Sequence, residues 1–200
     1  MIWLLVPLAY LAGSVQWGLI IVRLTHRLDI RTVGSGKTGM TNVLRTSGKL
    51  PAAAVLLGDA AKGLVVVVAA GMLTEHTSVH AAAAGAAIAG HVWPVFAGFR
   101  GGRGVSTGMG TTVMLDPWVM LIGILVFLPT VVITRYVSLG SVLSVVTVTA
   151  TFAVRAAFYE GPMAYVVFSV VCGTLIIAMH RDNIRRLLAG TERKVGQRVP

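Results

Sequence analysis

The sequence predicts an all-α integral membrane protein with seven transmembrane helices, one of them short, in a single membrane domain that covers residues 1–200. Its 200 residues are 56% hydrophobic and only 12% charged, and the mean hydropathy is +0.82. Soluble domains contain about 25% charged residues, so this composition excludes that class. The net charge of +10 would suggest nucleic acid in a soluble chain, but here the basic residues lie between apolar runs. We therefore expect membrane lipid, and no nucleic acid, as a partner.

Apolar runs of about 20 residues, the length that crosses a bilayer, predict the helices. In order, they cover residues 1–22, 50–73, 79–97, 117–134, 139–156 and 161–180. The first run has no basic segment before it, so we interpret it as a helix and not as a signal peptide. The second contains Asp59 and Lys62 at i and i+3, and charges inside a span predict an internal ion pair. A shorter run rich in Gly and Thr, 104–115, ends at Asp116-Pro117 and is either a short span or a half-membrane helix.

The basic residues predict the orientation. Seven crossings from an outside N-terminus place 15 of the 17 Lys and Arg residues on the cytoplasmic side, as the positive-inside rule requires. If run 104–115 did not cross, Arg135 and the basic tail would face outward. We therefore expect a cytoplasmic C-terminus and cytoplasmic motif loops at 23–49, 98–108, 135–141 and 180–200.

The first of these loops contains VGSGKTGMTN, residues 33–42, which at first sight suggests the phosphate loop of a nucleotide hydrolase. That motif needs a glycine five residues before Gly36, where this chain has Arg31, and it needs a surrounding α/β domain. Glycines that free backbone amides, short polar side chains and a planar guanidinium predict instead a site for a phosphorylated ligand. The alternative is an ordinary flexible basic loop. The residues concerned are Gly34, Ser35, Gly36, Thr41, Asn42 and Arg45.

The second loop contains Gly101-Gly102-Arg103-Gly104 and runs directly into an apolar helix that begins at Val105. Free N–H groups and the positive end of a helix favour phosphate binding at such a position. The alternative is a tight turn between helices that needs glycine for steric reasons.

Two histidines lie near the cytoplasmic ends of predicted helices. We interpret His91 as a structural hydrogen-bonding residue. His180 is followed by Asn183 at i+3, which places both on one helix face. The His, Cys and carboxylate residues do not cluster at metal-ligand spacing, so we propose no metal site.

Taken in this order, these motifs resemble the PlsY family of bacterial acyl-phosphate:glycerol-3-phosphate acyltransferases. The resemblance covers nearly the whole chain and is specific as a set. Its motifs are Gly13-Ser14, the first-loop glycines with Thr41-Asn42 and Arg45, GDAAKG at 58–63, GHVWPVFAGFRGGRGV at 90–105, TRYVSLGS at 134–141, and HRDNIRRLLAGTE at 180–192.

The resemblance implies an enzyme of the bacterial inner membrane that starts phospholipid biosynthesis without a cofactor. It would move an acyl chain from acyl phosphate to the sn-1 hydroxyl of glycerol 3-phosphate, giving lysophosphatidic acid and inorganic phosphate. The implied catalytic residues are Ser35, Arg45, His180 and Asn183. The implied substrate-binding residues are Gly34, Gly36, Thr41, Asn42, Gly101, Gly102, Arg103, Gly104, Ser138 and Ser141. Glu192 matches a glutamate that the family needs for structural integrity.

The chain departs from the family pattern at several positions. It has Lys37-Thr38 where the family usually has Asn followed by Pro or Ile, and Gln16 where the family has proline. It also has Met40 in place of alanine, and Arg100 and Arg103 in place of lysine. The arginines keep the charge but change its geometry.

The proton acceptor is open between His180 and a substrate phosphate, and we favour the phosphate because it is already at the site. No histidine is followed by aspartate at the HxxxxD spacing of the other large acyltransferase class. Two other functions would also explain basic loops: a transporter for phosphate or phosphorylated metabolites, and a non-enzymatic membrane subunit. The sequence leaves the oligomeric state and the preferred acyl-chain length open.

Overall fold

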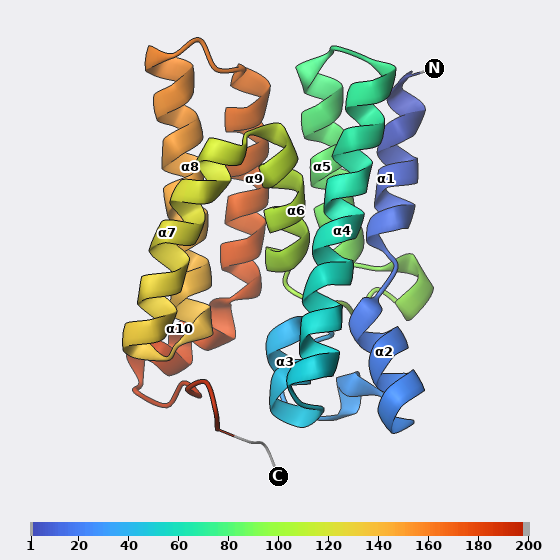
Figure 1. Ribbon diagram of the computed structural model, residues 1–200, viewed down its shortest axis with the longest axis vertical. Helices are drawn as coiled ribbons and strands as arrows, with labels where there is room; N and C mark the ends of the chain where they lie inside the picture. Colours follow the sequence, from blue (N-terminus) through green and yellow to red (C-terminus); the bar gives the residue numbers. More distant parts are fainter. Residues whose placement is uncertain (1, 198–200) are drawn as a thin grey trace.

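The computed structural model describes residues 2–197, and its regular secondary structure over this range is helical (Figure 1). Met1 belongs to the first predicted helix and residues 198–200 belong to the predicted basic tail; both lie outside the described residues. The helices are α1 (Leu5–Gly13), α2 (Trp17–His26), α3 (Met40–Thr46), α4 (Lys49–Leu73), α5 (Thr77–Val92), α6 (Val105–Leu115), α7 (Pro117–Thr134), α8 (Val137–Phe158), α9 (Met163–Met179) and α10 (Arg181–Leu188). Short 3-10 turns are η1 (Ile2–Leu4), η2 (Ile30–Thr32) and η3 (Val95–Ala97).

Five helical stretches are long and apolar enough to cross a membrane, and a sixth is added if α9 and α10, which meet at a bend of 58°, count as one span. The five are Ile2–His26, Lys49–Leu73, Thr77–Ala97, Pro117–Thr134 and Val137–Phe158. Helix α6 has 11 residues and is shorter than any of these. The prediction of an all-α multi-pass membrane protein is confirmed, whereas the count of seven crossings stays a prediction.

The first predicted helix, 1–22, is not continuous. Helix α1 ends at Gly13 and α2 begins at Trp17, because Gln16 has an extended backbone (φ −103°, ψ 90°). The predicted helix at 79–97 also ends early, at Val92, since Trp93 precedes Pro94 and a residue before proline disfavours the helical conformation. Both breaks lie near the motif loops and free backbone groups there.

Small residues allow the helices to approach closely. A Cβ atom at Gly13 would overlap the backbone of Ala87 in α5, and one at Gly110 in α6 would overlap the backbone of Ala60 in α4. Contacts of this kind are typical of helix pairs in membranes. Figure 1 shows the result: α6 lies between a group formed by α1, α4 and α5 and a group formed by α7, α8 and α9.

Helix α7 begins at a well-defined cap. Asp116 Oδ1 accepts hydrogen bonds from the backbone N–H groups of Trp118 (3.0 Å) and Val119 (3.2 Å), and Pro117 occupies the first turn. The other carboxylate oxygen of Asp116 lies 2.6 Å from Nε of Arg155 in the last turn of α8. This ion pair joins the start of α7 to the end of α8.

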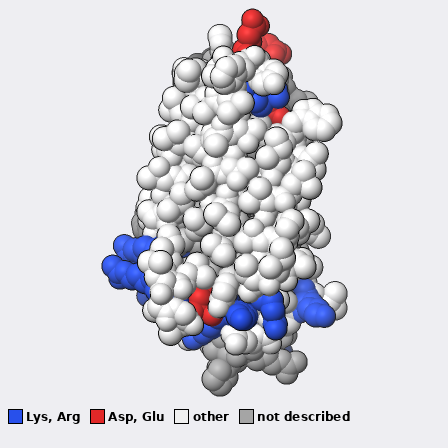
Figure 2. Space-filling model, turned by 90° about the vertical axis from the view of Figure 1, so that its left-hand side faces the viewer, with Lys and Arg blue, Asp and Glu red and all other residues white. Residues whose placement is uncertain are grey.

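The charged side chains gather at the two ends of the molecule. On the face seen in Figure 2, a wide band carries no charged residues, most Lys and Arg side chains lie toward the lower end, and both acidic and basic side chains lie near the upper end. Helices α2, α3 and α10 lie at the same lower end in Figure 1. The predicted motif loops therefore meet at the basic end of the molecule.

Candidate active site

Asn42, in the first turn of α3, organises the first motif loop. Its Oδ1 accepts a hydrogen bond from the backbone N–H of Ser35 (2.9 Å), and its Nδ2 lies within hydrogen-bond distance of the carbonyl oxygens of Val33 (3.1 Å) and Lys37 (2.9 Å). Gly34 has a φ of 64°, and a Cβ atom there would overlap Asn42 Oδ1. Asn42 is 3% exposed. Its amide is therefore occupied by the loop, and it presents Ser35 without offering a free polar group itself.

The second motif loop packs on His91. The N–H of Gly102 donates to the carbonyl oxygen of His91 (3.2 Å), and Cβ atoms at Gly101 and Gly102 would overlap that oxygen and the imidazole ring, respectively. The N–H of Gly102 is therefore hydrogen-bonded within the protein, and phosphate binding by this glycine run stays a prediction. Gly104, with a φ of 88°, caps α6 and turns the chain into the helix.

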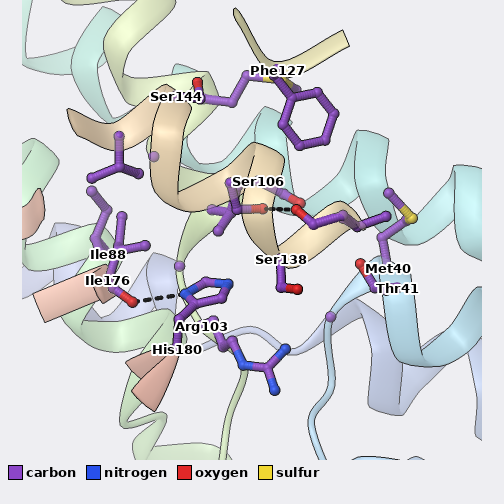
Figure 3. A pocket seen from close by; sticks show the side chains of 18 of the residues that line it. Met40, Thr41, Ile88, Arg103, Ser106, Phe127, Ser138, Ser144, Ile176 and His180 are labelled. Carbon is purple, nitrogen blue, oxygen red and sulfur yellow. Dashed lines mark hydrogen bonds between the residues drawn. The ribbon is translucent and has the colours of Figure 1, made fainter. Parts of the chain in front are cut away.

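Arg103 projects from this loop toward the cavity (Figure 3). Within the described residues its Nε is buried and has no hydrogen-bond partner. The pKa of Arg103 is lowered to about 10, first because the side chain is buried and secondly because the charge of Arg186 is near. The guanidinium remains charged near neutral pH, so this position favours an anion that would satisfy its donors.

Two more cations, Lys37 and Arg45, line the same cavity as Arg103. Burial is the main cause that lowers the pKa of Arg45 and the pKa of Lys37, and the charge of Arg103 adds to the effect on Lys37. Arg45 donates to the backbone carbonyl of Arg193 (2.8 Å), which holds it beside the C-terminal segment. Partly dehydrated cations this close together indicate a site for a strongly negative group.

Glu192 ties the third motif to the C-terminal segment. Its Oε1 accepts hydrogen bonds from Ser138 Oγ (2.9 Å) and Asn183 Nδ2 (2.7 Å), and its Oε2 accepts from Arg186 Nε (2.7 Å). Burial alone would raise the pKa of Glu192, but these hydrogen bonds and the charge of Arg186 outweigh burial and lower it. The carboxylate thus fixes α8, α10 and the tail relative to one another.

His180 lies between α9 and α10. Its Nδ1 donates to the carbonyl oxygen of Ile176 (2.8 Å), as Figure 3 shows, so Nε2 is the ring nitrogen left for a ligand. Asn183 uses Nδ2 for Glu192, and its Oδ1 is buried without a hydrogen-bond partner among residues 2–197. These two side chains therefore each retain one polar atom for a bound molecule.

The motif loops meet around one cavity of about 340 Å³ with two chemically different ends. The polar end is lined by Ser35, Lys37, Thr41, Asn42, Arg45, Arg103, Ser138, Ser141, His180, Asn183 and Glu192. The apolar end lies among α6 to α9 and is lined by Met120, Ile124, Phe127, Leu128, Val145, Val148, Phe168 and Ile176. In Figure 3, Arg103, His180 and Ser138 lie toward one end of the cavity, and Phe127 and Ser144 lie toward the other.

A second, polar cavity of about 250 Å³ adjoins the first and is lined by Gly34, Ser35, Lys37, Arg45, Arg103, Asp182, Arg186, Glu192 and Arg193. Five residues line both cavities, namely Ser35, Lys37, Arg45, Arg103 and Glu192. Residues 2–197 contain no group of three His, Cys, Asp or Glu side chains arranged to hold a metal ion. We call the polar end of the first cavity and the second cavity together the basic chamber, and the apolar end of the first cavity the apolar groove.

Most residues predicted from the sequence line these cavities, but three do not. Gly36 forms a turn in the first loop, with a φ of 66°, and Gly101 and Gly102 pack against His91. Sequence reasoning did not select Ser106 and Ser144, which also line the larger cavity. Both are serines within apolar helices, a pattern that could have indicated that they face a cavity.

The chain has extensive similarity to one family. The profile described as Glycerol-3-phosphate acyltransferase matches residues 3–190. A glycerol-3-phosphate acyltransferase from Halalkalibacterium halodurans is 44% identical over 198 residues, which cover 98% of this chain and 96% of that protein. One from Rubrobacter xylanophilus is 45% identical over 195 residues, which cover 98% and 96%.

Two solved structures share the fold. The crystal structure of PlsY (YgiH), an integral membrane glycerol 3-phosphate acyltransferase, in its glycerol 3-phosphate form matches with a TM-score of 0.89 and 38% identity, over 96% of this chain and 94% of that one. Its lysophosphatidic acid form matches with a TM-score of 0.87 and 37% identity, over 97% and 95%. The chain therefore belongs to the glycerol-3-phosphate acyltransferase family, the PlsY integral membrane enzymes.

Proposed function

We propose that this acyltransferase takes its acyl group from acyl phosphate and transfers it to the sn-1 hydroxyl of glycerol 3-phosphate. The products are 1-acylglycerol 3-phosphate (lysophosphatidic acid) and inorganic phosphate. The observation that carries the proposal is the cavity with a basic end and an apolar end. Acyl phosphate has the same division, since a phosphate is joined directly to a long apolar chain.

The basic chamber has the composition needed for two phosphates. Three cationic side chains, Lys37, Arg45 and Arg103, line both cavities, and Ser35 lines both as well. Guanidinium groups bind phosphate through paired hydrogen bonds. We assign Arg45 and Arg103 to the two substrate phosphates. Other predicted residues shape the chamber wall around them, namely Gly34, Thr41, Asn42, Gly104, Ser138 and Ser141.

The reaction then requires few chemical steps from the protein. The sn-1 oxygen attacks the carbonyl carbon of acyl phosphate, the bond between that carbon and the phosphate oxygen breaks, and phosphate leaves with the electron pair. Negative charge develops on the carbonyl oxygen in the transition state, where the Ser35 hydroxyl and nearby cations stabilise it. The remaining contribution is to hold the hydroxyl and the carbonyl carbon together.

The proton of the sn-1 hydroxyl passes to a substrate phosphate in this mechanism. His180 and Asn183 bind and orient glycerol 3-phosphate through Nε2 and Oδ1, the atoms that their other hydrogen bonds leave available. His180 as a general base is the alternative, and its pH dependence distinguishes the two roles.

We also propose that substrates reach the chamber from the cytoplasm and that the membrane is a bacterial inner membrane. The ion pair of Asp116 and Arg155 joins the end of α6 to the end of α8 that lies away from the basic end, which favours α6 as a short crossing and seven crossings in total. The basic chamber would then open on the side that the positive-inside rule makes cytoplasmic. The transporter and the non-enzymatic subunit are disfavoured by the family to which the chain belongs.

The test uses purified full-length protein in lipid, with radiolabelled glycerol 3-phosphate and either palmitoyl phosphate or palmitoyl-CoA. Labelled lysophosphatidic acid from acyl phosphate alone supports the proposal. Product from acyl-CoA alone would replace the proposed donor while leaving the family assignment in place. No product with either donor, from protein that elutes as a folded species and binds phosphate, would overturn the proposed reaction.

A further inference from the structure

Two charged residues inside the membrane span α4 have no part in the acyl-transfer steps above. Asp59 is 1% exposed and Lys62 is 8% exposed, and Lys62 Nζ lies 2.9 Å from Asp59 Oδ1. The predicted ion pair is therefore present. An ammonium group has three N–H donors, and the one that faces Asp59 makes a charge contact, since neither carboxylate oxygen of Asp59 has a hydrogen-bond partner within residues 2–197.

The other two donors of Lys62 reach different helices. Nζ donates to the carbonyl oxygen of Val15 (2.6 Å), which the break between α1 and α2 leaves free, and to Nδ1 of His91 in α5 (2.9 Å). Backbone groups at membrane depth need a hydrogen-bond partner, and Lys62 supplies one. Because His91 Nδ1 accepts this bond, the ring proton lies on Nε2, the nitrogen that faces Gly102.

His91 extends the contact to the second motif loop. Its carbonyl oxygen accepts from the N–H of Gly102 (3.2 Å) and from Nε2 of Gln16 (3.3 Å). Gly102 directly precedes Arg103, the buried cation of the basic chamber. Any movement of His91 would therefore displace the backbone that carries this guanidinium.

Gln16 extends the contact to the first motif loop. Its Oε1 accepts a hydrogen bond from Thr38 Oγ1 (2.7 Å), and Gln16 and Thr38 are 4% and 1% exposed. Thr38 lies next to Lys37, another cation of the chamber.

We propose that Thr38, Gln16, His91, Lys62 and Asp59 form one buried polar chain that fixes the two phosphate-binding loops relative to each other. Within this series of hydrogen bonds, Gln16 and Thr38 are positioning residues and do not touch substrate. This inference rests on the proposed function, since it concerns the placement of Lys37 and Arg103 for phosphate. Small displacements of such groups weaken binding strongly because each charge–phosphate contact depends on distance and angle.

The test removes the link between the loops with changes that preserve side-chain size, Gln16→Met, Thr38→Val and the double variant. Each single change should raise the dissociation constant for inorganic phosphate and the KM for glycerol 3-phosphate by roughly threefold to tenfold, with a smaller effect on kcat. Because both changes break the same bridge, the double variant should resemble the more affected single variant and not show the product of the two effects. Phosphate affinity is measured by calorimetry on the protein in lipid nanodiscs.

The matched control is Thr151→Val, since Thr151 lies in α8 away from the site and its hydroxyl, within residues 2–197, bonds only the Thr147 carbonyl of its own helix (2.8 Å). It should leave phosphate affinity and KM unchanged. Gln16→Glu keeps an oxygen that accepts from Thr38 but replaces the Nε2 donor to the His91 carbonyl with a second acceptor, so it should bind phosphate no better than Gln16→Met. Melting temperatures identify any variant whose fold, and not its site, has changed.

Two results would overturn the inference. One is unchanged phosphate affinity and KM in Gln16→Met and Thr38→Val. The other is independent effects that multiply in the double variant. If wild-type protein binds phosphate but makes no lysophosphatidic acid, the proposed reaction fails, and the phosphate affinities of the variants still decide whether the buried chain holds the loops.

Discussion

The Glu192→Gln variant tests how the C-terminal segment is held on the site. The change preserves size, and the new amide oxygen can still accept from Ser138 and Asn183 at the position of Oε1. The amide nitrogen would then face Arg186 Nε, which now lies 2.7 Å from Oε2, so a charge-assisted bond becomes a contact between two donors. The loss falls on the connection among α8, α10 and the tail.

The magnitude follows from burial. A hydrogen bond to a charged group contributes about 1.5–3 kcal/mol, and loss of one member of a fully buried ion pair costs roughly 3–5 kcal/mol. The Glu192 side chain is 2% exposed but that of Arg186 is 39% exposed, so water can replace part of the lost hydrogen bond to Arg186. We therefore expect the free energy of unfolding to fall by an amount within the lower of these two ranges. About 2 kcal/mol lowers the melting temperature of a chain of this size by roughly 4–8 °C.

The assay is thermal unfolding of the full chain in detergent, followed by the fraction that remains monodisperse. Glu75→Gln serves as the matched control because Glu75 is exposed in the turn between α4 and α5 and forms no ion pair within residues 2–197. A Glu192→Gln melting temperature equal to that of wild type and Glu75→Gln would refute the argument that this carboxylate holds the segment.

Three further predictions concern the site and its pH dependence. Arg103→Ala should raise the KM for glycerol 3-phosphate by about tenfold or more, because it removes a cation from the chamber. It should not lower the melting temperature, because neighbouring cations repel Arg103. Steady-state kinetics and thermal unfolding check the two effects, and an unchanged KM contradicts the first. His180→Asn should reduce turnover while leaving the pH profile of kcat unchanged, and loss of a titrating limb would instead make His180 the base. Folding lowers the pKa of Glu192, so its contribution to stability is present above its unfolded pKa of about 4.3 and is lost as the pH falls through the lower folded value. The melting temperature of Glu192→Gln should therefore decline less than that of wild type as the pH is lowered through this range.

The apolar groove gives one more prediction in the same group. Gly108 lines the larger cavity, and a Cβ atom there would make ordinary contacts with Ile176 (3.5 Å) and Ile88 (3.6 Å). Gly108→Ala should therefore fold normally and shorten the longest acyl phosphate that is used efficiently, as measured by turnover across donors of increasing chain length. Equal use of all donors by wild type and variant would show that the acyl chain does not reach this part of the groove.

Local patterns in the sequence predicted much of the fold. Apolar runs predicted the long helices, and Gly104 followed by Val105 predicted the start of α6. The break at Ser14 to Gln16 was missed because Ser14 and Gln16 are isolated polar residues in an otherwise apolar run from 1 to 22. What stabilises that break is Lys62, a residue on another helix, and periodicity along one segment carries no information about such a partner.

The candidate site shows the same limit. The residue types predicted a basic, phosphate-binding site, and most of them line the cavities. The sequence did not predict that the side-chain amide of Asn42 and the backbone N–H of Gly102 would form hydrogen bonds within the protein. Whether an amide or N–H faces a ligand or a neighbouring carbonyl depends on contacts between residues far apart in the chain, such as Gly102 with His91.

In the proposed reaction, an acyl phosphate lies across the two ends of one cavity and transfers its acyl group to the incoming glycerol 3-phosphate, and inorganic phosphate is released. The measurement that tests it most directly is the amount of inorganic phosphate released per lysophosphatidic acid formed by the purified enzyme, with palmitoyl phosphate as the only donor. We expect equal amounts of the two products throughout the reaction, and we expect Arg103→Ala to lower both together at low glycerol 3-phosphate. Lysophosphatidic acid without matching phosphate release, or phosphate release that does not depend on glycerol 3-phosphate, would contradict it.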